Sequence, residues 1–325
     1  MTNFQVYKKV LPFSLIQFLV NFASLLVFAG LCVGGFFLGE KLFDSKAFIG
    51  LAIGFILGIV IAILVNIFIS NRIKAAQIAM MAKGVTEGNL PEHTVKEGFN
   101  EIKGRFGKIT VFFFITGAIK GIFRQIGRVI NKIGTAVGGN TGNAITSTID
   151  SAVQTVVGYL CDCCLGWILV RKDQNAARAG CEGAIIFFKH GKTLIRNIGR
   201  IFGMGLLSLL LIGGAFFGIF CAIFLAMPKF FEYLVAEIAD VVARNGGGDI
   251  PEFFQNPTYL ALVAAAVFGI IMWTIIHSVF IRPFILTGVM RNFMAAGQQN
   301  MPTEQDFAEL SNKSPKFAKL ANKDI

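Results

Sequence analysis

Two side chains inside an apolar stretch near the C-terminus could do chemistry. His277 is the only Asp, Glu, Lys, Arg or His within any of the four long apolar stretches of the chain. An ionisable group in hydrocarbon is a candidate for binding or proton handling, although near an interface it can equally be a simple hydrogen-bonding group. Trp273 lies one helical turn before it and could offer an aromatic face. We therefore take both as candidate substrate-binding residues, with hydrogen bonding at the interface as the alternative.

A polar edge runs along the first apolar stretch. Ser14, Gln17 and Asn21 recur at intervals of three and four residues, which places them on one side of a helix. Polar groups in hydrocarbon seek partners, so this edge should face protein or a water-filled cavity. Gln17 and Asn21 are candidate substrate-binding residues, and hydrogen bonding between helices is the alternative.

Cysteines gather in the middle of the chain. Cys161, Cys163 and Cys164 lie close together, with Cys181 and His190 further on. The spacing resembles soft metal ligation but lacks the paired Cys-x-x-Cys pattern of structural zinc sites. We predict reduced thiols and no metal or cofactor, with S-acylation beside the membrane as a further option. Nucleophile elbows, phosphate loops and dinucleotide fingerprints are absent from the sequence, so catalytic residues and an enzyme activity are not predicted.

The composition indicates which solvent surrounds these residues. Of 325 residues, 54% are hydrophobic, 34 are Phe and only 15% are charged, which is too apolar for a soluble domain. Four stretches are long enough to cross a bilayer, which takes roughly 20 helical residues. They are Leu11–Leu38, Ala47–Ser70, Ile201–Met227 and Tyr259–Ile281. We predict an all-α integral membrane protein with four transmembrane helices in two hairpins.

The charges predict the orientation of these spans. The loops between the first and second spans and between the third and fourth spans hold 4 of the 30 basic residues and 7 of the 19 acidic ones. Cytoplasmic segments near spans carry the excess of Lys and Arg, so both termini and the segment Asn71–Arg200 should be cytoplasmic. The pI of about 9.5 follows from this bias, and nucleic-acid binding is not needed to explain it.

The central segment contains an amphipathic helix pattern. Between Ile119 and Val137 apolar residues repeat every three or four positions, and a basic stripe runs opposite them. This pattern predicts a helix in the headgroup layer that binds anionic lipid, or a helix packed on its own protein with a solvated stripe. The stripe consists of Lys120, Arg124, Arg128 and Lys132. The apolar runs Ile109–Ile119 and Val157–Val170 are predicted as interfacial or re-entrant elements, because two further spans would expose these cations on the acidic side.

Glycine spacing predicts close helix packing in the second span. Gly50, Gly54 and Gly58 form successive small-xxx-small repeats, which let another helix approach and are a possible oligomer contact. We divide the chain into an N-terminal transmembrane hairpin (1–71), a cytoplasmic or interfacial helical segment (72–200), a C-terminal transmembrane hairpin (201–281) and a cytoplasmic tail (282–325).

From Cys161 onward the chain resembles the C-terminal part of the choline transporter-like solute carriers. The similarity lies in Cys-x-Cys-Cys-Leu-x-Trp at Cys161–Trp167, in Asn175-Ala176, in Gly183 and Phe187, and in the run Leu194–Arg200 that leads into a glycine-rich span. It covers about half of the chain. Those carriers are larger, with more spans and a large extracellular domain after the first span.

The resemblance implies choline or a similar small organic cation as substrate. A quaternary ammonium is recognised by aromatic faces, and Trp167, Tyr159 and Trp273 could supply them, with anchoring at the membrane interface as the alternative.

We therefore expect a transporter-like multi-pass protein. The alternatives are a non-catalytic scaffold or accessory subunit of a membrane assembly, and a lipid-binding, membrane-shaping protein. The expected partners are anionic membrane lipids and either further copies of the chain or a larger membrane complex.

Overall fold

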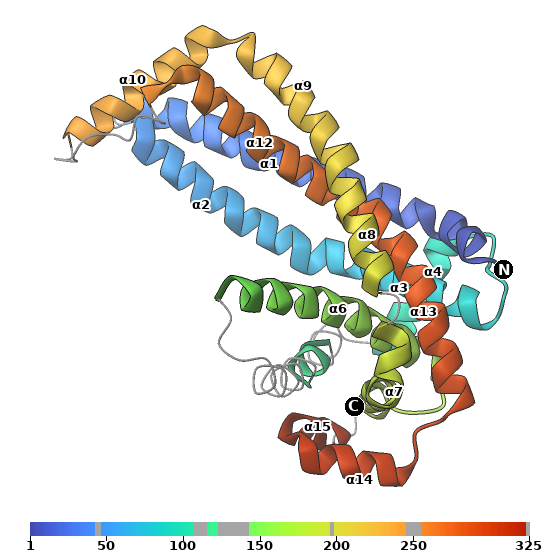
Figure 1. Ribbon diagram of the computed structural model, residues 1–325. Coiled ribbons are helices and arrows are strands. Elements are labelled where there is room, and N and C mark those ends of the chain that lie inside the picture. The colour runs from blue at the N-terminus through green and yellow to red at the C-terminus, as the bar shows by residue number, and fades with distance from the viewer. Residues whose placement is uncertain (43–46, 107–115, 123–142, 196–197, 245–254, 323–325) are drawn as a thin grey trace. The chain divides into compact units, whose positions relative to one another are not determined.

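A computed structural model describes residues 1–42, 47–106, 116–122, 143–195, 198–244 and 255–322 of the chain. It divides into a first unit, Met1–Ile198 with Arg282–Ile325, and a second unit, Gly199–Ile281. Every regular element in the described ranges is a helix (Figure 1). The predicted all-α class is therefore confirmed.

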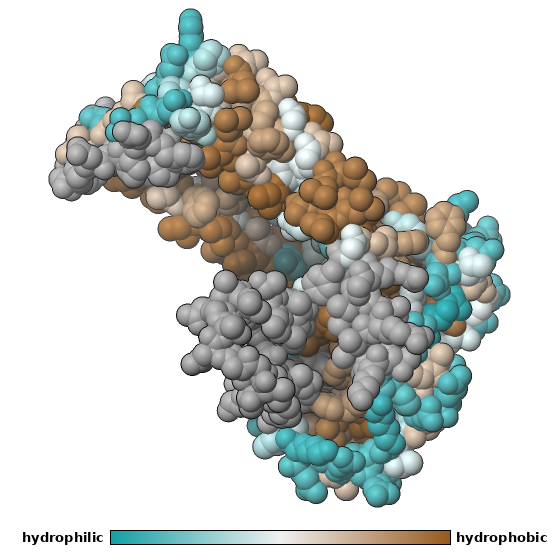
Figure 2. All heavy atoms as spheres, in the orientation of Figure 1, coloured by the Kyte–Doolittle hydropathy of each residue, from teal (hydrophilic) through white to brown (hydrophobic). Residues whose placement is uncertain are grey.

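Four of the helices are long and apolar enough to cross a membrane. They are Asn3–Leu42, Ile49–Thr86, Gly203–Leu225 and Pro257–Gln299, and each overlaps one of the four predicted spans. In lipid the backbone must satisfy its own hydrogen bonds, which a continuous helix does. Figure 2 shows hydrophobic side chains gathered on the surface of these long helices. The prediction of a multi-pass membrane protein is thus supported.

In the first unit, α1 (Asn3–Leu42) and α2 (Ala47–Val65) form a close hairpin. Their backbones almost touch, because a Cβ atom on Gly50 would overlap the carbonyl oxygen of Gly35 and one on Gly54 would overlap that of Leu31. A Cβ on Gly58 would lie 2.6 Å from the Phe28 ring. The glycine face of the second span therefore packs against α1 inside the hairpin.

The helices of the first hairpin continue beyond the predicted spans into a protein core. After a short π-helix, η1 (Asn66–Ser70), the second long helix continues as α3 (Asn71–Thr86), in which the side chains of residues 75–82 are buried. Val10 and Phe13, in the first turns of α1, are fully buried as well. One helix thus changes its surroundings along its length, from exposed apolar side chains to side chains covered by protein.

Several further helices of the described residues belong to this core, which we call the helical core. They are α4 (Thr94–Phe106), α6 (Asn143–Val170), α7 (Ala176–Ile195), α13 (Arg282–Gln299), α14 (Glu304–Lys313) and α15 (Pro315–Ala321). Helix α3 packs against α4, α6 and α13, and α15 packs against α7. Its largest fully buried side chains include Trp167, Phe293 and Phe317.

Two segments differ from the sequence-based expectation. Residues 159–169 of α6 are buried by neighbouring helices, so most of the apolar run Val157–Val170 is covered by protein where the sequence suggested contact with the membrane. Residues 282–322 are no separate tail, because α13, α14 and α15 pack into the helical core. An apolar stretch of about a dozen residues suits a buried helix as well as a membrane one, and hydropathy does not distinguish them.

In the second unit, α8 (Ile198–Ser208), η2 (Leu209–Gly213) and α9 (Gly214–Leu225) run into α10 (Pro228–Arg244). Helix α12 (Pro257–Ile276) and η3 (His277–Ile281) return against α9. The Asn256 side chain accepts hydrogen bonds from the backbone amides of Thr258, at 2.9 Å, and Tyr259, so it caps the start of α12. A Cβ on Gly269 would lie 3.1 Å from the backbone nitrogen of Phe217, so glycine lets these two helices approach closely.

The hairpin packing predicts a sharp difference between two glycines of the first unit. Replacing Gly54 by Ala should destabilise α1 against α2 by about 1–3 kcal/mol, because the added methyl overlaps the backbone of Leu31. Gly30→Ala is the matched control, since a Cβ there meets no described atom within 4 Å. Thermal unfolding in detergent checks this, and equal melting temperatures for the two variants would contradict it.

Candidate functional site

The candidate site is built around one buried carboxylate. Asp162 on α6 is 6% exposed, and each of its two oxygens faces a different cation. Its Oδ1 lies 2.8 Å from Nζ of Lys74 on α3, and its Oδ2 accepts a hydrogen bond of 2.8 Å from the guanidinium of Arg282, the first residue of α13. Three helices far apart in sequence therefore meet at one charge.

These ion pairs explain why a charge is tolerated inside an apolar helix. Burial by itself would raise the pKa of Asp162, but Lys74 and Arg282 together outweigh burial and hold that pKa below its usual value. Asp162 is thus ionised at neutral pH. Arg282 is stabilised from a second side, because its guanidinium carbon lies 5.3 Å from the centre of the Tyr159 ring.

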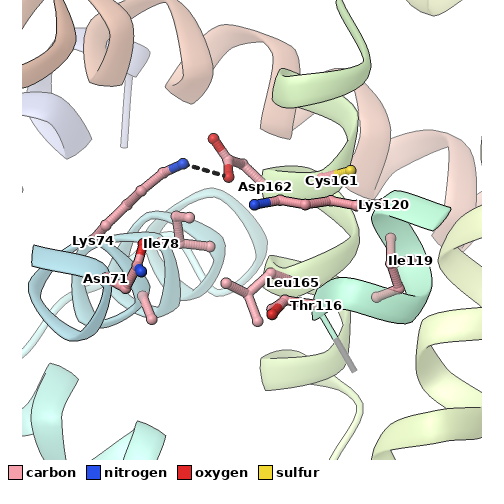
Figure 3. A pocket seen from close by; sticks show the side chains of 10 residues that line it. Asn71, Lys74, Ile78, Thr116, Ile119, Lys120, Cys161, Asp162 and Leu165 are labelled. Carbon is pink, nitrogen blue, oxygen red and sulfur yellow. Dashed lines mark ion pairs between the residues drawn. The ribbon is translucent and has the colours of Figure 1, made fainter. Parts of the chain in front are cut away.

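A small cavity of about 80 Å³ opens beside Asp162. Figure 3 shows that the ammonium groups of Lys74 and Lys120 both point toward the Asp162 carboxylate, Lys74 from α3 and Lys120 from the helical residues 116–122. The cavity is lined by Asn71, Lys74, Ala75, Ile78, Thr116, Ile119, Lys120, Cys161, Asp162 and Leu165. With Arg282 on its far oxygen, Asp162 leaves an excess of positive charge around this space.

The structure describes only the start of the predicted amphipathic helix. Ile119 and Ile122 are buried in the helical core, whereas Lys120 is exposed. This first part is therefore packed on its own protein, as one of the two sequence-based alternatives had it. Arg124, Arg128 and Lys132 lie outside the described residues.

The polar edge of the first span makes hydrogen bonds within the first unit. The Gln17 amide donates to Asn21 Oδ1 at 3.1 Å, and the Ser70 hydroxyl donates to the same oxygen at 3.4 Å. Further along, the Gln77 amide donates to the Ser14 hydroxyl at 2.9 Å. Asn21 and Ser14 therefore join α1 to the helix that contains η1 and α3, and Gln17 bonds to Asn21 within α1.

The candidate aromatic residues belong to two different units of the chain. Trp167 belongs to the helical core, where its indole N–H donates to Glu182 at 2.9 Å and Arg171 lies 5.9 Å from the ring centre. Trp273 and His277 lie in the second unit, with ring centres 5.3 Å apart. The Trp273 indole N–H donates to the Ser208 hydroxyl at 3.1 Å, across the two spans of that unit.

The central cysteines are buried thiols. Burial raises the pKa of Cys161 and of Cys181 to about 12, and it raises the pKa of Cys163 and Cys164 as well, so all four stay protonated. A Cβ on Gly183 would lie 2.9 Å from the Cys164 sulfur, so this glycine brings α7 against α6. Within the described ranges, no three His, Cys, Asp or Glu side chains gather as a metal site requires.

The sequence showed Asp162 only as an interruption of an apolar run, and it did not reveal Lys74 and Arg282 as its partners. A usable signal was nevertheless present. Lys74 and Arg282 are basic residues close behind the ends of the second and fourth spans, and Asp162 is the only acid in the apolar run of α6. A lone carboxylate in such a run requires cations nearby.

Replacing Asp162 by Asn should destabilise the helical core by about 2–3 kcal/mol, because it leaves two cations without their counter-charge. We expect a smaller loss of stability than for a fully enclosed ion pair, since 39% of the Lys74 side chain is exposed and can be hydrated. Trp167 fluorescence during thermal unfolding reports the change. Glu309→Gln, which removes the exposed pair with Lys313, should have almost no effect.

The pH dependence has a defined sign. A lowered pKa in the folded state adds stability above the unfolded value of about 4, and this contribution is lost as the pH falls toward the folded value. The unfolding temperatures of wild type and Asp162→Asn should therefore converge as the pH falls below about 4. A difference that stays constant down to pH 2 would contradict this.

Comparison of the chain with protein-family models, with curated proteins and with solved structures gave no match. The resemblance to choline transporter-like carriers remains an expectation that rests on short motifs.

Proposed function

We propose that this protein is a non-catalytic scaffold of a membrane assembly. It self-associates through glycine faces on its spans. The observation that carries the proposal is a pair of open small-xxx-small surfaces. A Cβ atom on Gly30 or Gly34 of α1, or on Gly214 or Gly218 of α9, would meet no described atom within 4 Å. These surfaces have the spacing that lets membrane helices pack closely, yet no described part of the chain fills them.

The contrast with the internal glycines supports this proposal. Gly35, Gly50 and Gly54 bring α1 and α2 so close that no side chain would fit between them. Between helices in lipid, close van der Waals contact takes over much of the role that the hydrophobic effect has in water. The open glycine pairs on α1 and α9 therefore provide the same means of contact to another membrane helix, and a second copy of this chain is the simplest partner.

The polar groups inside the spans also favour a scaffold. Asn21 accepts hydrogen bonds from Gln17 and from Ser70, and Trp273 donates to Ser208. Each of these contacts joins side chains within one unit. Such bonds fix helices in register, which a scaffold requires and a moving transport pathway would have to break.

Transport remains the second candidate, because one polar atom favours it. The carbonyl oxygen of the Gln17 side chain is buried and has no hydrogen-bond partner among the described residues. The described spans also contain three π-helical segments, η1, η2 and η3, and such segments occur often at functional sites. A polar solute that reached Gln17 could use that oxygen.

The scaffold proposal is tested by replacing a glycine of each open face with a large side chain. Gly34→Ile and Gly218→Ile should lower self-association in lipid nanodiscs or vesicles, because each isoleucine keeps a partner helix at a distance. A Cβ atom at either position meets no described atom within 4 Å, so the monomer should keep its thermal stability. Native mass spectrometry and energy transfer between labelled copies measure the assembly. A wild type that is monomeric at every protein-to-lipid ratio would overturn the proposal.

Uptake of labelled choline into proteoliposomes separates the two candidates. A scaffold gives no flux above empty vesicles, and Gln17→Leu then changes nothing. Saturable uptake by the wild type that Gln17→Leu abolishes, in protein that still unfolds at the wild-type temperature, would establish the transporter instead.

A further inference from the structure

We propose that the cavity beside Asp162 binds the phosphate group of an anionic membrane lipid. The inference is independent of the proposed scaffold, since it concerns a different surface of the chain. It rests on the charge, the size and the position of the cavity.

The charge around the cavity is positive and incompletely balanced. Asp162 is already paired through Oδ1 with Lys74 and through Oδ2 with Arg282, so its single negative charge faces two cations. The Lys120 ammonium points into the same space and adds a third (Figure 3). Positive charges gathered at a partly enclosed site favour an anion that can accept hydrogen bonds from several of them.

The lining suits a phosphate. Lys74 and Lys120 can donate to its oxygens, and the polar side chains of Asn71 and Thr116 lie on the same wall. The volume of about 80 Å³ is far below the roughly 300–1,000 Å³ of pockets that enclose whole organic ligands. The space therefore fits one small anionic group whose remainder extends outside, as a lipid headgroup does.

The position of the cavity favours a lipid over a soluble phosphate. Asn71 is the first residue after η1, where the apolar span ends, and Lys74 lies about 5 Å further along the helix axis. Arg282 directly follows the last residue of η3 at the end of the fourth span. Both cations thus follow closely after an apolar span along the chain, and the phosphates of a bilayer lie where spans end.

Lys120 allows a test that spares the fold. It is exposed and has no described ion pair, whereas Lys74 and Arg282 hold Asp162. The full chain in detergent would be titrated with phosphatidic acid, with phosphatidylglycerol and with phosphatidylcholine, and bound lipid counted by native mass spectrometry. Lys120→Gln should lower the affinity for the first bound anionic lipid molecule by roughly fivefold, which is the effect of one lysine near a charged lipid surface. The affinity for phosphatidylcholine should not change. Lys319→Gln, an exposed lysine on α15, is the matched control and should behave as wild type.

The outcomes separate the sources of the anion. Equal affinity of wild type and Lys120→Gln for anionic lipid would overturn the proposal, as would equal binding of phosphatidylcholine. A titration with inorganic phosphate forms the second arm. Phosphate binding that needs Lys120, without any preference for anionic lipid, would assign the cavity to a soluble phosphate and overturn the lipid source.

Discussion

The first unit depends on one constraint, which is that cations at the ends of two spans must be held close together in a partly apolar place. Lys74 and Arg282 carry the same charge and would repel each other where α3 packs against α13 if no anion lay between them. Asp162 lies between them, 2.8 Å from each, and converts this repulsion into two attractions. Because α6 supplies the carboxylate, its apolar side chains are positioned between the same helices, and the helical core is assembled around the charge.

The same arrangement explains how the two parts of one long helix can lie in different surroundings. Along Ile49–Thr86 the first part exposes large apolar side chains such as Ile56 and Phe68, whereas Met80 and Met81 are fully buried. Lipid covers the first part and protein covers the second, and polar residues mark the change: Ser70 bonds to Asn21, and Lys74 bonds to Asp162. Continuity of the helix keeps the backbone satisfied across the boundary, so no loop is needed there.

The parts of the fold that were predicted correctly are those that depend on the residues of one helix alone. Each span could be found because a length of charge-free apolar residues is a property of a single segment. Val157–Val170 was predicted as an interfacial or re-entrant element because hydropathy measures how apolar a segment is and not whether lipid or protein covers it. Likewise, Gly50 and Gly34 have the same local spacing in sequence, and only the facing helix shows that Gly50 packs inside the hairpin while Gly34 stays open. The partners of Asp162 were missed for the same reason, since they come from helices distant in the chain.

The aromatic residues that resemble a choline site illustrate how such chemistry can serve the fold. A quaternary ammonium needs an aromatic face without a competing cation. The Tyr159 ring already has the Arg282 guanidinium at 5.3 Å, and the Trp167 ring has that of Arg171 at 5.9 Å. A tethered guanidinium competes at a high effective concentration, so a free organic cation would have to displace it from either face. Displacing Arg282 would also remove one of the two cations from Asp162, and binding at Tyr159 would thus weaken the contact that assembles the helical core. The cost of that coupling favours a structural role for these faces over substrate recognition.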